Sequence, residues 1–269
     1  MKIGNAILLP TIILLVLLTF SCVTMSQMEK VIIPPDSLQM VVVTTPNWNA
    51  SSGNMQLFER ENVSSSWYLV GKQEKVVVGR KGLGWSHEYA RFGLKSIKRE
   101  GDKKSPAGLF YLSSIFGYAS VSKIGDSKMP YLHATKNLVC VDDVNSAFYN
   151  RIVDLSTTEK KDWKSHENMR RRDNLYRLGV VVEHNVSPTR KGKGSCIFLH
   201  IWRNSHKPTV GCTAMAPKII KNLISWLDLE KKPILVQLPQ VEFEKSNKKW
   251  CLPTSIQNQP ACQSKRRIR

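Results

Sequence analysis

The chain has 269 residues, with 40 Lys and Arg against 21 Asp and Glu, which gives a formal net charge of +19. Hydrophobic residues make up 42% of it and charged residues 23%, a composition that is typical of a globular protein and excludes a disordered or collagen-like chain. The sequence contains one long apolar run, so it is not a polytopic membrane protein, and its length allows one or two domains.

The apolar run lies at the N-terminus, where residues 6–20 follow a short basic start at Lys2. A membrane-spanning helix needs about 20 apolar residues, so these fifteen favour a secretory signal peptide over residues 1–21. Pro10 within the run also argues against a long unbroken anchor helix. We therefore expect an exported protein that resides in the periplasm or cell envelope.

Two cleavage sites fit the end of this leader. Cleavage before Cys22 would give a lipoprotein-type N-terminus with the lipid on that cysteine, and this lipid would be the chain's one membrane anchor. Cleavage after Ser26, beside the small residue Thr24, would give an unmodified start. In both cases we interpret residues 22–37 as an N-terminal linker.

The positive charge is scattered in short groups, such as residues 170–172, 191–193 and 266–267. None of these groups has the spacing of a helix-turn-helix or a zinc finger, so we expect no nucleic acid partner. Outside the cytoplasm such an excess favours an anionic envelope surface. A merely solvated basic surface is the alternative.

The cysteines show no CxxC pair, so a zinc ribbon or a thioredoxin-type motif has nothing to start from. Cys140 and Cys196 lie in apolar runs and either pair in an oxidising compartment or stay as buried thiols. Cys251 and Cys262 bracket a short segment that a disulfide could close. The connectivity cannot be derived from the sequence.

Short β-type runs separated by turn residues follow the leader, which predicts a β-meander. These expected strands cover residues 38–45, 55–58, 67–70 and 75–80. Residues 98–109 are polar and rich in Gly and Pro, and we expect a looser segment there.

Helices and strands alternate in the second half. We expect a helix over residues 162–178, capped by Asp162, and strands over 179–184, 196–202 and 233–238. Residues 217–228 predict a helix, because Pro217 suits its first turn and the apolar residues follow at i, i+3, i+4 and i+7.

Residues 38–239 thus predict a single β-rich α+β domain with a few packed helices. After this domain the sequence becomes polar and basic, and we assign residues 240–269 to a C-terminal tail.

The candidate catalytic residues lie between Gly194 and Met215. His200 ends an apolar β-type run, and Cys212 follows twelve residues later, directly after Gly211. A strand, a loop and a return of this length bring an imidazole beside a thiol, which is what a cysteine nucleophile needs. Backbone N–H groups around Cys212, at Gly211 and Thr213, are candidates for stabilising an oxyanion.

Other chemistries are less well supported. A zinc site from His184, His200, His206 and Cys212 fits by residue type but lacks H-E-x-x-H or a similar spacing. Serine catalysis lacks a G-x-S-x-G motif. The adjacent Asp142 and Asp143 would point to opposite faces of a strand, which argues against a glycosidase pair. We therefore expect neither a metal nor an organic cofactor.

Two motifs in this order resemble a known family. The segment G-D-x-x-S-P-x-G, at residues 101–108, precedes His200 and the motif T-x-G-C, at residues 209–212. Together with the β-meander they are similar to the YkuD-type L,D-transpeptidase catalytic domain over residues 38–238. The resemblance implies a β-sandwich-like fold, peptidoglycan stem peptides as substrates, Cys212 as nucleophile and His200 as base. It also implies that the carbonyl of Ile201 orients the imidazole.

The sequence departs from this family at two positions. Val210 stands where the family often has a histidine, and His206 or His184 is a spatial substitute. Ala214 stands where the family tends to place an arginine, and Arg203 is the candidate replacement. Trp202, beside His200, is a candidate wall of the cleft.

The resemblance therefore predicts an L,D-transpeptidase, with an L,D-carboxypeptidase or a cross-link hydrolase as alternatives that use the same pair. A sortase-like enzyme fits less well, because His200 and Cys212 are closer than that fold needs and no arginine matches downstream. A non-catalytic envelope-binding lipoprotein is the alternative of another class.

Overall fold

The structure is a computed structural model that describes residues 33–92, 96–125 and 127–253. The signal peptide, Cys22 and Cys262 lie outside these residues, so the predictions made for them stay predictions. The strands are β1 (Gln39–Thr45), β2 (Ser52–Glu59), β3 (Tyr68–Val77), β4 (Leu83–Trp85), β5 (Ser105–Gly117), β6 (Tyr131–His133), β7 (Leu138–Val141), β8 (Ile152–Asp154), β9 (His166–Asn168), β10 (Leu178–Val182), β11 (Phe198–Ile201), β12 (Thr213–Met215) and β13 (Ile234–Pro239).

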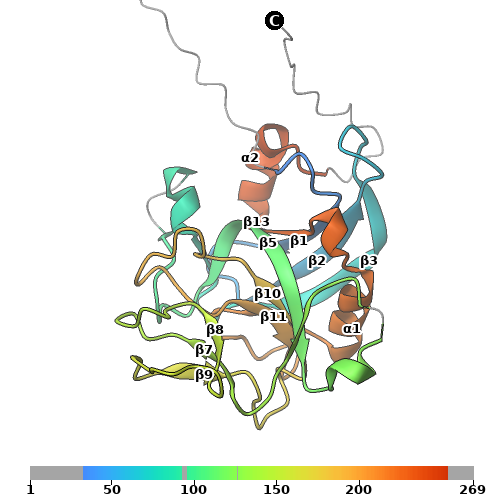
Figure 1. Ribbon diagram of the computed structural model, residues 1–269. Coiled ribbons are helices and arrows are strands. Elements are labelled where there is room, and N and C mark those ends of the chain that lie inside the picture. Colours follow the sequence, from blue (N-terminus) through green and yellow to red (C-terminus); the bar gives the residue numbers. More distant parts are fainter. Residues whose placement is uncertain (1–32, 93–95, 126, 254–269) are drawn as a thin grey trace, which may run out of the picture. The chain divides into compact units, whose positions relative to one another are not determined.

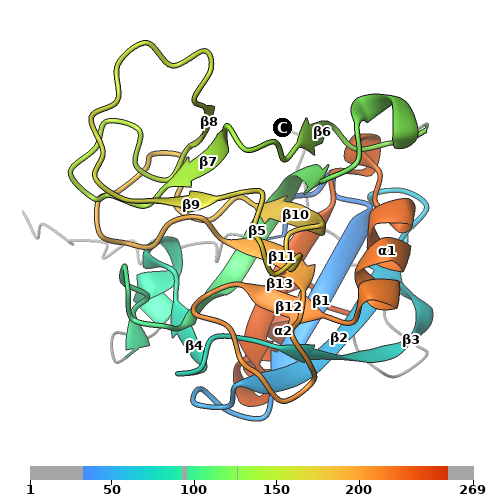
Figure 2. The same cartoon turned by 90° about the horizontal axis from the view of Figure 1, so that it is seen from below.

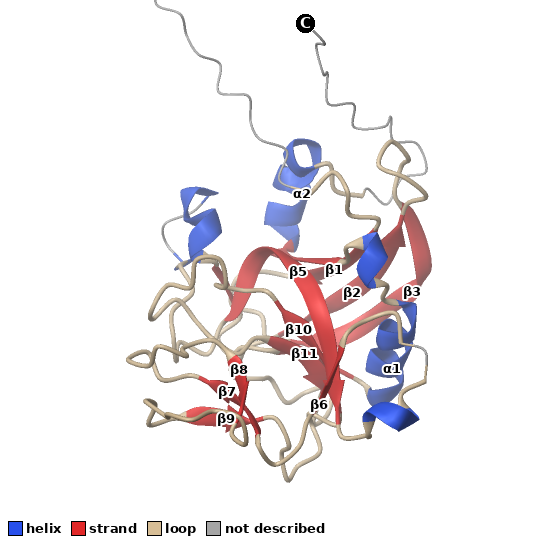
Figure 3. Cartoon of the chain, viewed as in Figure 1, coloured by secondary structure: helices blue, strands red, loops and turns tan. Residues whose placement is uncertain are grey.

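The α-helices are α1 (Pro217–Trp226) and α2 (Gln240–Trp250), and short 3-10 helices include η1 (His87–Phe92), η3 (Val121–Lys123) and η4 (Leu229–Lys231). Within the described ranges, no helix has the length and apolar character that crossing a membrane requires. The predicted β-rich class with few helices is confirmed (Figure 3).

The main sheet closes on itself. Its strands follow the order β10-β11-β12-β3-β2-β1-β13-β5-β4, and β10 also pairs with β5. This second pairing joins β10, at one end of the path, to β5, the strand next to the other end, so the sheet is a barrel-like sandwich rather than an open layer (Figure 1). Most neighbours are antiparallel, but four pairs of the described strands are parallel: β1 with β13, β11 with β12, β4 with β5, and β5 with β6.

The core of this closed sheet follows from continuous apolar runs in its central strands. Residues 40–43 of β1 are at most 2% exposed, and the six residues of β13 beside it are all buried. Strands that are buried on both faces have such runs instead of alternating polar residues. These strands were predicted, because a β-branched apolar run bounded by turn residues carries the signal.

The helices and a second, smaller sheet pack around the main sheet. The helix α1 lies against β10 and β11, with Ile220 and Leu223 buried, as the i, i+3 spacing predicts. Strands β8, β7 and β9 form a three-stranded sheet on the side of the barrel away from α1 (Figure 2). A disulfide joins Cys140 of this small sheet to Cys196, just before β11, which settles one alternative that the sequence left open.

The predicted helix over residues 162–178 is wrong. This segment contains the short strand β9 and a series of turns. Asp162 does not cap a helix, because its carboxylate accepts hydrogen bonds from Ser146 Oγ at 2.5 Å and from the Ala147 N–H at 2.8 Å. Asn174 has a φ of 57°, in the left-handed region, which a helix interior excludes. Tertiary contacts thus override a modest helical pattern.

Two further differences concern element boundaries. The runs over residues 67–70 and 75–80 were expected as separate strands, yet they belong to the single strand β3, in which Gly71 takes a φ of 69° without ending the strand. The opposing strand shows a register shift between Met55 and Leu57, which accommodates the irregularity. Residues 240–250, assigned to the tail, form α2, and its Trp250 is 1% exposed in the main core.

Candidate active site

Cys212 lies in the turn that leads into β12, and its sulfur is held by backbone groups. The Phe198 N–H donates to Sγ at 3.4 Å, and the thiol is 3.5 Å from the carbonyl oxygen of Cys196, to which it donates. The thiol is free and the residue is 5% exposed. Because β12 pairs with β11 in parallel, these contacts bring residues sixteen positions apart to one place.

His200 lies on β11, opposite Ala214 of β12. Its Nδ1 is 2.8 Å from the carbonyl oxygen of Ile201. A carbonyl can only accept a hydrogen bond, so Nδ1 carries the hydrogen and Nε2 is the basic nitrogen. The orientation of the ring by Ile201 is the one that the family resemblance predicts.

His200 and Cys212 line one cavity of about 170 Å³. Three other predicted or discussed residues, Trp202, Arg203 and Val210, line it as well. The structure therefore brings together the predicted nucleophile, the predicted base and two of the predicted substrate contacts, Trp202 and Arg203.

Tyr176 contacts both reactive side chains. Its ring centroid is 5.0 Å from that of His200, in an edge-to-face arrangement, and Tyr176 packs in the same buried cluster as Cys212. Among the hydrogen bonds of the described residues, none joins His200 to Cys212 directly. The structure thus holds the thiol and the imidazole in one cavity without a hydrogen bond between them.

Burial keeps this pair neutral. The pKa of the Cys212 thiol is raised to about 12, mainly by burial and then by the charge of Glu167, against the hydrogen bond from the Phe198 N–H. The pKa of His200 is lowered to about 4, mainly by burial, although its bond to the Ile201 carbonyl acts in the opposite direction. At neutral pH the site holds a thiol and a neutral imidazole, so the base can accept a proton.

The predicted oxyanion donors differ in availability. The Gly211 N–H donates to Thr209 Oγ1 at 3.2 Å, and Thr213 is part of the β12 ladder. Within the described chain the Cys212 N–H has no hydrogen-bond partner, so it is the donor left for an oxyanion. The Gly211 N–H, one of the predicted donors, is thus engaged, and an unpaired N–H among the described residues of this turn belongs to Cys212, which was not among the predicted donors.

The G-D-x-x-S-P-x-G segment is hydrogen-bonded to the backbone of Cys212. Ser105 Oγ donates to the Cys212 carbonyl at 2.9 Å and accepts from the Gly79 N–H at 2.9 Å. Asp102 receives the Lys104 N–H at 2.9 Å and closes the turn before Ser105. Ser105 and Cys212 are 107 residues apart in the sequence, so this hydrogen bond brings the two motifs together.

A buried polar chain extends this support to β13. Thr213 Oγ1 donates to Gln237 Oε1 at 2.6 Å, and Gln237 Nε2 donates to the Pro106 carbonyl at 2.8 Å. All of these groups are buried and paired, so the chain fixes the strand after Cys212 to the strand that carries the first motif. Gln237 was not predicted, because one polar residue in an apolar strand carries no pattern.

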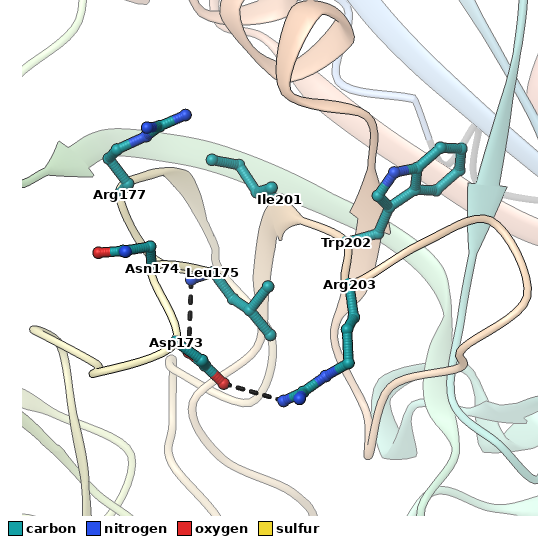
Figure 4. Close-up of a pocket in the computed structure, with 7 residues that line it drawn as sticks. All are labelled: Asp173, Asn174, Leu175, Arg177, Ile201, Trp202 and Arg203. Atoms are coloured by element: carbon teal, nitrogen blue, oxygen red, sulfur yellow. Dashed lines mark hydrogen bonds and ion pairs between the residues drawn. The ribbon is translucent and has the colours of Figure 1, made fainter.

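Arg203 lies at the rim of the cavity and also lines a neighbouring shallow pocket (Figure 4). Its guanidinium is 3.1 Å from Asp173, with the side chain 61% exposed. Figure 4 shows the two side chains approaching each other from opposite sides of this pocket. An exposed ion pair of this kind contributes little to stability, so the Arg203 guanidinium can exchange Asp173 for another carboxylate at low cost.

His184 does not belong to the cavity. Its ring is 1% exposed, Nδ1 is 3.2 Å from Ser86 Oγ, and Nε2 is 3.0 Å from the Lys193 carbonyl oxygen. Burial lowers its pKa to about 3. His206 is exposed and bonds to Ser205. Neither histidine lines the cavity, so the place of the family's second imidazole is taken by Val210, which is 65% exposed.

Four cavity residues were missed by the sequence analysis. Tyr176 and Glu167 are hydrogen-bonded to each other at 2.6 Å, Arg171 lies over the Tyr176 ring at 5.0 Å, and Lys207 lines the opening. The helix predicted for residues 162–178 hid the pair, because positions nine apart lie about 180° apart around a helix. A strand and a turn instead bring them together.

The closed sheet therefore holds a buried Cys/His pair, an imidazole oriented by a backbone carbonyl and, among the described residues, an unpaired N–H at Cys212. The YkuD family, the L,D-transpeptidase catalytic domain, matches residues 48–236, and the chain belongs to this family. At family level its activity is of the L,D-transpeptidase type and acts on peptidoglycan. No curated protein and no solved structure matched the chain significantly.

Proposed function

We propose that this protein is an exported cysteine acyltransferase that forms a thioester between Cys212 and peptidoglycan stem peptides. One observation carries the proposal: a free thiol and an imidazole with a fixed tautomer line the same basic cavity. Export rests on the apolar run over residues 6–20, and lipid attachment at Cys22 remains one of its two forms.

The chemistry starts from the neutral pair. Nε2 of His200 takes the proton of Cys212 as the sulfur attacks the carbonyl of the residue before a terminal D-amino acid. The Cys212 N–H donates to the oxygen of the tetrahedral intermediate. Protonated His200 then gives its proton to the leaving amine, which breaks the C–N bond and leaves a thioester.

The second half of the reaction decides between the activities. If the amine of another stem peptide attacks the thioester, the product is a cross-link. If water attacks, the protein is an L,D-carboxypeptidase or a cross-link hydrolase. The same two residues serve each outcome, so the acceptor and not the catalytic pair distinguishes them.

The charge around the cavity supports an anionic donor. Arg171, Arg203 and Lys207 line it, and Glu167 is the acidic residue among them. Stem peptides carry free carboxylates, which guanidinium groups bind with two parallel hydrogen bonds. Ala214 occupies the position where the family tends to have an arginine. We therefore propose Arg203 and Trp202 as the substrate contacts in its place.

The decisive experiment compares the products formed from isolated sacculi. Purified wild-type protein and the Cys212→Ala variant are incubated with sacculi, and the muropeptides are separated and identified by mass spectrometry. New cross-linked dimers show a transpeptidase, and shortened stems or lost dimers show a hydrolase. If neither changes and Cys212 also lacks unusual reactivity toward iodoacetamide, the non-catalytic envelope-binding lipoprotein remains.

A further inference from the structure

The cavity that contains Cys212 also holds a hydrogen-bonded pair of side chains, Tyr176 and Glu167. Tyr176 Oη donates to Glu167 Oε2 at 2.6 Å, and Tyr176 and Cys212 belong to the same buried cluster of side chains. A hydrogen bond with Tyr176 lowers the pKa of the Cys212 thiol, against the larger effect of burial. Tyr176 is 3% exposed, and all three side chains line the cavity. A tyrosine bonded to a carboxylate therefore lies in the same cavity as the sulfur of Cys212.

The single hydroxyl hydrogen of Tyr176 can be donated to only one acceptor at a time. The hydroxyl therefore donates either to Glu167 or to Cys212 but not to both. An ionised Glu167 can only accept a hydrogen bond, so Tyr176 donates its hydrogen to Glu167. A protonated Glu167 donates to the phenol oxygen instead, and the hydrogen of Tyr176 is then available to the sulfur.

We propose that Tyr176 is a further catalytic residue that donates a hydrogen bond to the Cys212 sulfur in the reactive thiolate, and that Glu167 positions this donor by taking up or releasing a proton. The inference rests on the proposed function, because the thiolate matters only if Cys212 is the nucleophile. In the step itself the S–H bond breaks, Nε2 of His200 gains the proton, and the Tyr176 hydrogen turns to the sulfur. The proton on Glu167 comes from solvent.

Charge favours the same coupling. Glu167 and a thiolate at Cys212 would be two negative groups in one partly buried place, so the ionisation of one opposes that of the other. Burial raises the pKa of Glu167, which brings its protonated form closer to neutral pH. Arg171, which lies over the Tyr176 ring, acts in the opposite direction.

Other charged groups around the pair are few among the described residues. Asp142 and Glu100 act on Glu167 and raise its pKa, and Asp173 and Arg171 act on His200. Two further cations, Arg203 and Lys207, line the cavity. All of these groups are left unchanged in the variants below, so a change in reactivity reports on Tyr176 and Glu167.

The test is a double-mutant cycle read by iodoacetamide labelling of Cys212, with the labelled peptide identified by mass. Glu167→Gln removes the charge and supplies an amide that can donate to Tyr176. We expect it to label about tenfold faster at pH 7, the effect of lowering the thiol pKa by one unit. Tyr176→Phe keeps the ring beside His200 but loses the donor, and we expect slower labelling.

The cycle separates a relay from simple charge removal. The acceleration by Glu167→Gln should be at least about threefold larger with Tyr176 present than in the Tyr176→Phe background. Equal acceleration in both backgrounds, or no acceleration in a folded Glu167→Gln variant, overturns the proposal. Labelling needs no peptidoglycan, so inactivity on sacculi would count against the proposed function and not against this coupling.

The chain offers a matched control. Tyr149 Oη donates to Glu100 Oε2 at 2.5 Å, a second buried tyrosine–carboxylate pair that does not line the cavity. Tyr149→Phe should label at the wild-type rate. Circular dichroism and the mass of the intact Cys140–Cys196 disulfide verify that each variant has folded.

Discussion

The thiol of Cys212 donates to the backbone carbonyl of Cys196 at a sulfur–oxygen distance of 3.5 Å, and Cys196 is itself cross-linked to Cys140. Cys196 has a φ of 54°, and its N–H donates to Asn150 Oδ1 at 2.9 Å. The disulfide thus fixes the segment whose carbonyl and following N–H groups surround the sulfur.

Replacing Cys140 and Cys196 together by Ser should lower the free energy of unfolding by about 4 kcal/mol, because the bond closes a loop with a sequence separation of 56 residues. Urea titration of the purified variant measures this loss. Acylation of Cys212 by a carbapenem should also slow, since the backbone around the sulfur is less fixed. An unchanged urea midpoint would contradict the structural role of the disulfide.

The Cys212→Ala variant should lose all activity on sacculi and keep its fold. The substitution removes the nucleophile but little volume, so no large cavity results. Muropeptide analysis measures activity, and thermal unfolding measures the fold. Full activity in this variant would exclude the cysteine mechanism.

Replacing His200 by Gln should slow both iodoacetamide labelling and carbapenem acylation of Cys212 by about 10²-fold, the usual size of general-base catalysis. The neutral imidazole is the proton acceptor on this side of the cavity. His206→Gln is the matched control, because His206 is exposed and does not line the cavity. Should His206→Gln slow the reaction and His200→Gln not, the base would have to be reassigned.

Acid should destabilise the fold through His184. Its pKa is about 3 in the folded state, against 6.5 for an ordinary free histidine side chain, so the unfolded chain binds one more proton between these values. The free energy of unfolding therefore falls as the pH is lowered from about 6.5, by up to about 1.4 kcal/mol per pH unit for this residue. Urea titrations at several pH values give the slope. The slope should be shallower in His184→Gln and unchanged in His206→Gln.

The mature protein should begin at residue 22 or at residue 27 and lie outside the cytoplasm. The fifteen apolar residues over 6–20 and the small residues after them give this expectation. Intact-mass measurement of the envelope form distinguishes a lipidated Cys22 from an unmodified start. Recovery of soluble cytosolic protein that still carries Met1 would exclude export.

The sequence was sufficient for the parts of the site that depend on local pattern. His200 lies in an apolar strand and Cys212 follows a glycine in a turn, so both positions and their proximity were predictable. The strands β1 and β13 and the helix α1 were equally accessible, because each has a continuous or periodic apolar signal.

The remaining parts depend on contacts that no local pattern carries. β12 has three residues and exists because β11 and β3 pair with it on either side. Tyr176 and Glu167 meet only because residues 162–178 form a strand and turns instead of a helix. The support of the Cys212 carbonyl by Ser105 spans 107 residues, and such pairing is decided by the closure of the whole sheet.

Trp250 determines how far towards the C-terminus a recombinant fragment of this domain must extend. Its ring lies 5.6 Å from Tyr89 and 5.5 Å from Phe92, and Tyr89 in turn covers Gly108, where a Cβ atom would come within 2.3 Å of its ring. A fragment cut at residue 236, where the family match ends, would expose these aromatic rings to water and invite aggregation. Expression plasmids and crystallisation trials should therefore retain the chain through residue 253.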